Sequence, residues 1–246
     1  EKIPIPFPNY FKSIYLHSTA TLDRGYPTYI LGEVRESGGF REYYLVGFLL
    51  KTPLPLIIFI TGALWGYRKT KSKDEILFLI TPIMLYFIIA SINPLQDGMR
   101  YILLIFPFLA VLAGKFVEFD YSKTRTIIIL ILSLWYVIGT LSVYPHYESY
   151  YNEIADGPDN GYKYFIGRSD AGQQLKLLGE YMGDEDIDEI KIAKYGFWIP
   201  YELEYRGIKY QDLTCKRTTG IVVLGANELQ GSSRYGENFF SWLKDY

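Results

Sequence analysis

The sequence contains few of the residues from which soluble catalytic and metal sites are usually built. It has one cysteine, Cys215, and two histidines, His17 and His146. A single cysteine excludes an intramolecular disulfide and a thiolate metal cluster, and two isolated histidines are too few ligands for zinc. A glycine-rich phosphate loop, a GxSxG motif and an HExxH motif are also missing. We therefore expect no metal site, a partly buried structural role for Cys215, and no cofactor that a motif identifies.

An excess of positive charge is missing as well. The chain has 25 Lys and Arg residues against 27 Asp and Glu residues, and its formal net charge is −2. Basic residues do not alternate with aromatic residues in a stripe, so nucleic acid is excluded as a partner. The dense acidic run GDEDIDE at 183–189 follows an expected helix and precedes an expected strand. We interpret it as a solvent-exposed turn rather than a metal site.

Apolar residues, in contrast, are abundant and unevenly placed. They make up 49% of the chain and are concentrated in residues 43–144, between two polar flanks. A helix crosses the hydrocarbon core of a bilayer in roughly 20 residues, and four segments in this region meet that length. These segments are Tyr43–Tyr67, which must bend at Pro53 and Pro55, Ile76–Ile92, Tyr101–Phe119 and Ile127–Tyr144.

The predicted fold is an α-helical transmembrane bundle of four segments at 43–144, followed by a small extracytoplasmic α/β domain at 145–246. Residues 1–42 form a polar, interfacial flank in which Asn9–Leu22 has the spacing of a short amphipathic helix. Within 145–246 the pattern predicts helices at Gln173–Met182, Tyr201–Tyr205 and Phe239–Tyr246, and strands at Lys191–Tyr195, Ile208–Tyr210 and Ile221–Leu224.

The short loops predict the orientation of the bundle in its membrane. Four basic residues lie in the loop at 68–75, and three more surround the loop after the third segment, whereas the loop at 93–100 has only Arg100. The positive-inside rule places the two basic loops in the cytoplasm. The N-terminal flank, the loop at 93–100 and the domain after Pro145 then share the extracytoplasmic side of the plasma membrane or an equivalent membrane.

Two basic residues lie inside or beside apolar segments, where a charge is costly and usually functional. Lys51 lies eight residues after Tyr43, roughly 12 Å deep if that stretch is helical. Arg100 precedes the apolar run of the third segment, near the same outer surface. Two cations at similar depth can hold a phosphate at the level of the lipid headgroups. The alternative is that each side chain extends to the headgroups on its own.

Four ordered stretches resemble a known family. They are RGYPTYILGEV at 24–34, FLLKTPLPL at 48–56, RYILLIFPFLAVLAG at 100–114 and YPHYESYYNEIADGPDNGYKY at 144–164. Together they resemble the C-terminal half of the polytopic glycosyltransferases related to protein O-mannosyltransferases, which belong to glycosyltransferase family 39 and have the GT-C architecture.

The resemblance implies a sugar donor on a polyprenyl or dolichyl phosphate and transfer to a protein or glycan acceptor on the extracytoplasmic face. It implies a catalytic acid in the first outer loop, so the catalytic carboxylate is expected upstream of this chain. Lys51 and Arg100 match basic residues that the family places near the lipid-phosphate cavity. The chain departs from the family at 25–27, where GHP is usual, and at 170–175, where a DWGQDL-like string is usual, so the resemblance assigns no particular acceptor.

Two other function classes stay open from the sequence. One alternative is that the chain is a non-catalytic membrane anchor that displays residues 145–246 as a binding domain. A transporter is the weaker option, because the four segments show no inverted repeat and no polar midplane.

The orientation gives a first testable prediction. A reporter fused after Tyr246 is expected to report an extracytoplasmic location, because four crossings return the chain to its starting side. Paired alkaline phosphatase and fluorescent protein fusions measure this. A cytoplasmic signal from the fusion would contradict the four crossings.

Overall fold

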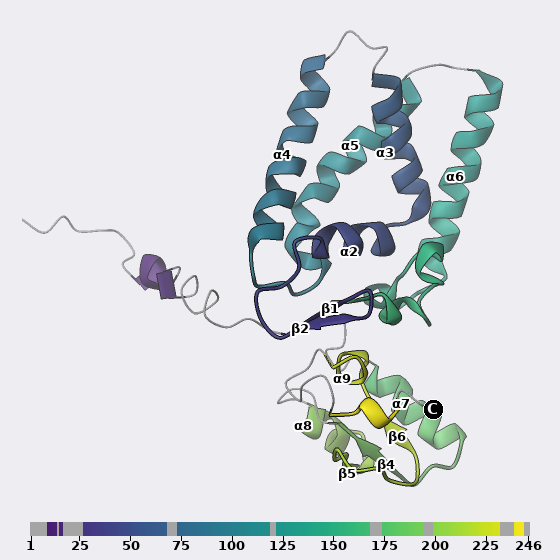
Figure 1. The fold of residues 1–246 in the computed structure, drawn as a ribbon. Helices are drawn as coiled ribbons and strands as arrows, with labels where there is room; N and C mark the ends of the chain where they lie inside the picture. The colour runs from purple at the N-terminus through teal and green to yellow at the C-terminus, as the bar shows by residue number, and fades with distance from the viewer. Residues whose placement is uncertain are drawn as a thin grey trace, which may run out of the picture.

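A computed structural model gives the fold of the chain (Figure 1). It describes residues 9–13, 15–16, 27–67, 73–118, 122–167, 174–193, 199–231 and 239–243. In the predicted amphipathic segment, residues 9–13 and 15–16 are helical, and the rest of that segment lies outside the described residues. The remaining described residues form a helical bundle, a small antiparallel sheet at one end of it, and an α/β unit beyond that sheet (Figure 1).

The long helices of the bundle run side by side (Figure 1). Among the described residues, three stretches are long and apolar enough to cross a membrane: α4 (Lys73–Ile92), the 3-10 helix η1 (Met99–Ile105) continued by α5 (Phe106–Glu118), and α6 (Lys123–Leu141). Large apolar side chains are exposed along them. On α6, for example, Ile131, Leu134 and Ile138 are each more than half exposed. Such surfaces suit hydrocarbon as the surrounding solvent.

The first predicted span differs from a simple crossing. It divides into α2 (Tyr43–Lys51) and α3 (Leu54–Tyr67), which meet at an angle of 110°. Thr52 is extended, with φ −101° and ψ 132°, as expected for a residue before proline. The 14 residues of α3 reach about 21 Å, less than the roughly 30 Å of the hydrocarbon core. Among the described residues, three helices are therefore long and apolar enough to cross a membrane, or four if the bent pair counts as one span, where four were predicted.

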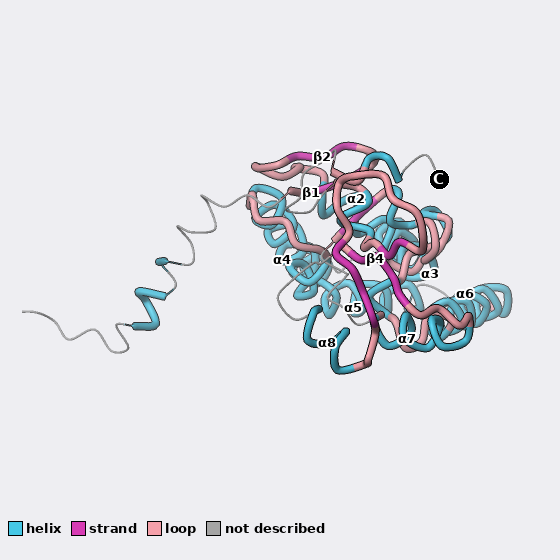
Figure 2. The backbone as a smooth tube through the Cα atoms, turned by 90° about the horizontal axis from the view of Figure 1, so that it is seen from below, coloured by secondary structure: helices cyan, strands magenta, loops and turns pink. Residues whose placement is uncertain are grey.

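Helix α2 lies across the ends of the other helices, as Figure 1 shows. Its buried residues Tyr43, Tyr44, Gly47 and Leu50 occupy successive turns of one face. The strands β1 (Thr28–Ile30) and β2 (Glu33–Arg35), the loop at 93–98 and the described residues after 145 all lie at this end. The last turns of α3 and α5 and the first turns of α4 and α6 lie at the other end (Figure 1). Seen from below (Figure 2), α6 stands at the outer edge of the bundle.

The hydrophobic core of the bundle extends past the predicted boundary at residue 145. Tyr151, Ala155 and Phe165 belong to the same buried cluster as α2 to α5. They come from a segment with three 3-10 turns, η2 (Tyr147–Ser149), η3 (Glu153–Ala155) and η4 (Gly161–Lys163). The sequence pattern places this segment in the α/β domain, whereas in the structure the rings of Tyr151 and Phe165 contact Lys51 and Tyr43 of α2.

A three-stranded antiparallel sheet joins the two flanks of the bundle. It contains β1 (Thr28–Ile30), β2 (Glu33–Arg35) and β3 (Phe165–Ile166) in the order β2-β1-β3. Tyr29 pairs with Ile166 and Ile30 with Phe165. The hydroxyl of Tyr29 donates to the carbonyl of Lys163 at 2.6 Å. Strand β1, which precedes the first apolar segment, is thus held against β3, which follows the last one.

The α/β unit comprises the described residues from 174 onward. It contains α7 (Leu175–Asp184), β4 (Glu189–Ile192), α8 (Ile199–Tyr205), β5 (Lys209–Asp212), β6 (Val222–Val223), α9 (Ala226–Leu229) and the 3-10 turn η5 (Ser241–Leu243). Its strands are parallel in the order β5-β4-β6, with a core that includes Leu175, Ile190 and Leu203.

Most elements expected in this region are present with shifted ends. Where a helix was expected at 239–246, the described residues hold only the turn η5. Cys215 is exposed rather than partly buried, because it lies in the loop between β5 and β6. The acidic run at 183–189 spans the end of α7, a turn and the first residue of β4, as the interpretation as a turn requires.

Candidate functional site

A cavity of about 320 Å³ opens where α2, η1 and the segment after α6 meet. Leu103 and Phe106, from η1 and the start of α5, give the cavity an apolar part, and residues in and beside η2 line another part. The lining residues are Lys51, Asp97, Gly98, Met99, Arg100, Leu103, Phe106, Tyr147, Glu148, Tyr150, Phe165 and Gly167. Both cations singled out in the sequence therefore line one cavity, although they belong to different elements.

Lys51 is the last residue of α2. Its Nζ donates to the backbone carbonyl of Glu148 at 2.7 Å and lies 4.4 Å from the centre of the Tyr151 ring. An ammonium group has three donors, and a cation over an aromatic face gains electrostatic stabilisation. Glu148 takes one donor, so the same ammonium has further donors to offer toward the cavity that Lys51 lines.

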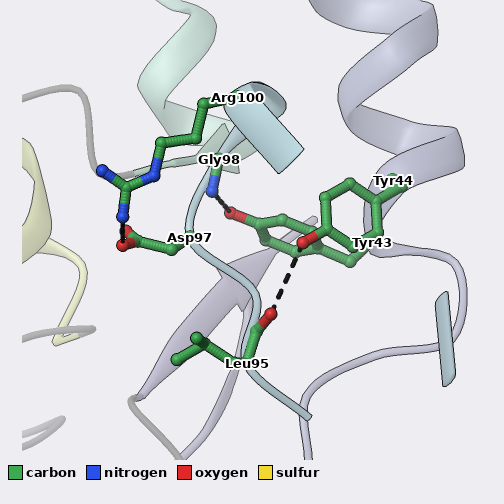
Figure 3. A network of polar contacts seen from close by, with 6 residues as sticks. All are labelled: Tyr43, Tyr44, Leu95, Asp97, Gly98 and Arg100. Atoms are coloured by element: carbon green, nitrogen blue, oxygen red, sulfur yellow. Dashed lines mark hydrogen bonds and ion pairs between the residues drawn. The ribbon is translucent and has the colours of Figure 1, made fainter. Parts of the chain in front are cut away.

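Arg100, the second lining cation, lies at the start of η1. It forms an ion pair with Asp97, three residues earlier (Figure 3), and its guanidinium lies 5.3 Å from the centre of the Tyr101 ring. The Arg100 side chain is 55% exposed, whereas that of Asp97 is only 13% exposed. A guanidinium has five N–H donors, so a half-exposed arginine can bind an anion while it keeps its carboxylate partner.

Two buried tyrosines hold the loop that carries Asp97 and Arg100 (Figure 3). The hydroxyl of Tyr43 accepts from the backbone N–H of Gly98 at 3.0 Å and donates to the carbonyl of Ile166 at 3.1 Å. The hydroxyl of Tyr44 donates to the carbonyl of Leu95 at 3.5 Å. Each tyrosine is 1% exposed. Since both belong to the first turn of α2, the loop and the helix that carries Lys51 form one unit.

The end of α2 is held by Asn152. The last carbonyls of a helix have no partner within it. The Asn152 side-chain amide donates to the carbonyls of Leu49 at 2.6 Å and Thr52 at 2.8 Å, and its backbone N–H donates to the carbonyl of Leu50 at 2.9 Å. Asn152 is 1% exposed. One residue thus satisfies three carbonyls around Lys51 and fixes the helix end that presents it.

The neighbouring tyrosines complete this wall. Tyr151 donates its hydroxyl to the carbonyl of Phe165, and its ring lies so close to Gly161 that a Cβ there would be 2.0 Å from the ring. Burial raises the pKa of the Tyr151 hydroxyl. Burial, followed by the Glu153 carboxylate, raises the pKa of Tyr150 to about 12. Both hydroxyls are therefore neutral near pH 7.

A glycine pair allows the two sides of the cavity to meet. A Cβ on Gly167 would lie 2.7 Å from the Cα of Gly98, closer than a side chain tolerates. Gly98 itself has φ +78°, a conformation that favours glycine. The turn before η1 and the end of β3 therefore approach each other backbone to backbone.

The other predicted residues do not join this site. His17 lies outside the described residues, and His146 precedes η2 but does not line the cavity. Within the part of the chain that the structure describes, no group of three or more His, Cys, Asp or Glu residues is placed to hold a metal ion. The sequence analysis missed Asp97, Glu148 and Asn152. The only sequence signal for any of them is the three-residue spacing of Asp97 and Arg100.

Comparisons with protein-family models, curated proteins and solved structures return no match for this chain.

The geometry around Asn152 gives a second prediction. Asn152→Ala is expected to destabilise the protein by about 1–3 kcal/mol, because a buried carbonyl that loses its donor costs about that much. Asn152→Asp, which removes the same donors, should also destabilise it. Thermal unfolding in a mild detergent measures the change. Asn160→Ala is the matched control, since the Asn160 amide bonds only side chains near the surface in the described structure. Equal melting temperatures for the Asn152 and Asn160 variants would contradict the role of Asn152.

Proposed function

We propose that this chain belongs to an integral-membrane glycosyltransferase that transfers a sugar from a polyprenyl or dolichyl phosphate to a protein or glycan acceptor on the extracytoplasmic side. Lys51 and Arg100 bind the phosphate of the donor lipid. The observation that carries the proposal is their position: the two cations, from different elements, line one cavity whose inner wall is apolar.

The order of the lining residues matches the parts of such a lipid. Arg100 stands at the mouth of the third span, and Leu103 and Phe106 follow it along the same span. At about 2.0 Å per residue of 3-10 helix, they lie roughly 6 and 12 Å deeper than Arg100. Leu103 is 57% exposed. An isoprenoid tail lies against this apolar wall while its phosphate stays at the level of the cations.

The charges suit a phosphate leaving group. In the proposed reaction an acceptor hydroxyl attacks C1 of the sugar, a base takes the hydroxyl proton, and the bond from C1 to the phosphate oxygen breaks with its electron pair. The phosphate changes from a diester with one negative charge to a monoester with up to two. Cations that stabilise charge developing in the transition state raise the rate as well as the affinity. The family resemblance implies that this base is a carboxylate.

A non-catalytic anchor is the alternative. It is supported by a second cavity, of about 620 Å³, between α7 and the turn after α8, which shares no lining residue with the first. If the chain only displays the α/β unit, this second cavity binds the ligand, and Lys51 and Arg100 are dispensable.

The third prediction separates the two functions. Lys51→Ala and Arg100→Ala are each expected to reduce kcat/KM for transfer from a polyprenyl-phosphate sugar by about 10- to 100-fold, since each removes a charged donor to the phosphate. Lys51→Arg and Arg100→Lys keep the charge and should lose less. Transfer is measured with radiolabelled polyprenyl-phosphate hexoses and the membrane protein in nanodiscs.

Lys163→Ala serves as the control, because Lys163 bonds Asn160 at the surface of the same outer segment and does not line the cavity. Membrane insertion and protein yield should be equal for all variants. Parent-level turnover in both Lys51→Ala and Arg100→Ala would overturn the proposal and leave the anchor.

A further inference from the structure

We propose that Tyr147 binds the sugar ring of the lipid-linked donor, stacking its aromatic face on the ring next to the phosphate. This inference rests on the proposed function, because it takes the phosphate to lie between Lys51 and Arg100. It adds the residue that recognises the sugar as distinct from the lipid.

The first support is the position of Tyr147 relative to Lys51. The Nζ of Lys51 donates to the carbonyl of Glu148, the next residue in the chain, at 2.7 Å. The cation that holds the phosphate therefore also holds the peptide group after Glu148, one residue beyond Tyr147. A sugar is joined to its phosphate through a single oxygen, so a phosphate at Lys51 brings its sugar beside η2.

The second support is the exposure and fixation of the ring. Tyr147 lines the cavity, yet its side chain is 48% exposed, so one face is available. Tyr144 packs edge-on against it, with ring centres 6.1 Å apart and planes at 72°. The backbone carbonyl of Tyr147 accepts from the N–H of Tyr150 at 3.2 Å, at the end of η2. A ring held by a neighbouring ring and along its backbone loses little further freedom when a ligand binds.

The third support is the order of chemistry across the cavity. The wall along η1 and α5 offers Leu103 and Phe106, the middle offers the two cations, and the η2 wall offers aromatic rings with polar neighbours. Ligand pockets combine apolar or aromatic surface with a few placed polar groups. A pyranose has an apolar face of C–H groups and a polar edge of hydroxyls, so the η2 wall fits it and the η1 wall does not.

The test compares two lipids that differ only in the sugar. One probe is polyprenyl-phosphomannose or polyprenyl-phosphoglucose, and the other is polyprenyl methyl phosphate, which has the same chain and the same phosphodiester charge. Dissociation constants are measured with the membrane protein in nanodiscs. The parent is expected to bind one of the glycosylated lipids more tightly than the methyl ester.

Tyr147→Ala should weaken binding of that glycosylated lipid by about 3- to 10-fold, the range of an aromatic stacking contact, and leave the methyl ester unchanged. Tyr147→Phe keeps the ring and should bind like the parent, whereas Tyr147→Leu keeps apolar bulk without the aromatic face and should resemble Tyr147→Ala. Tyr205→Ala, at a tyrosine of α8 that is 85% exposed, is the control and should change neither constant.

The outcomes distinguish this inference from the proposed function. If Tyr147→Ala and Tyr147→Leu weaken both lipids equally, Tyr147 is an interfacial anchor and the inference fails. It fails also if neither variant changes the preference, or if the parent has no preference for a glycosylated lipid. Lys51→Ala should weaken both lipids, and if neither lipid binds the parent, the proposed function itself fails.

Discussion

The break between α2 and α3 is the constraint on which the rest of the site depends. Near a bilayer, a backbone carbonyl without a partner is expensive, and the turn at Thr52 leaves the carbonyls of Leu49, Leu50 and Thr52 without helical donors. Asn152 supplies all three. To bring Asn152 to these carbonyls, the chain after α6 must run beside α2. The residues of η2 then line the same cavity as those of η1. The cavity exists because one helix end has to be satisfied from a distance of about a hundred residues in sequence.

The same passage explains why two cations can remain beside apolar spans. Lys51 is stabilised by a carbonyl and an aromatic face, and the Glu148 carboxylate interacts with its charge electrostatically. Arg100 is balanced by Asp97, and its loop is tied to α2 by Tyr43. Of the two cations that line the cavity, Lys51 makes no hydrogen bond to a carboxylate in the described structure. Arg100 has a carboxylate partner, Asp97, three residues earlier in the chain. An anion that enters meets groups already in position, which reduces the ordering that binding requires.

Composition alone was enough to predict the bundle, because long apolar runs have few alternatives to a membrane span. Pro53 and Pro55 predicted the bend in the first segment. The size of that bend and the 3-10 start of the third segment were not predictable, since both depend on how α2 lies across the other helices. Lys51 and Arg100 stood out because charge is rare in such runs. Asn152 and Glu148 did not, because they lie in a polar stretch where neither residue is unusual, and their partners are far away in sequence. The same holds for β3, which pairs with β1 across the whole bundle.

The ion pair of Arg100 with Asp97 also bears on how the cavity holds an anion. A partly exposed pair contributes about 0–1 kcal/mol, so it adds little to the stability of the fold. It matters more for the cavity, where it keeps a cation beside Leu103 without a large desolvation cost. Because Asp97 is 13% exposed and Arg100 is 55% exposed, the acid anchors the pair and the guanidinium faces outward. Under the proposed function, a phosphate at that position would share the guanidinium with Asp97 rather than displace it, and Lys51, which lines the same cavity, would supply further positive charge.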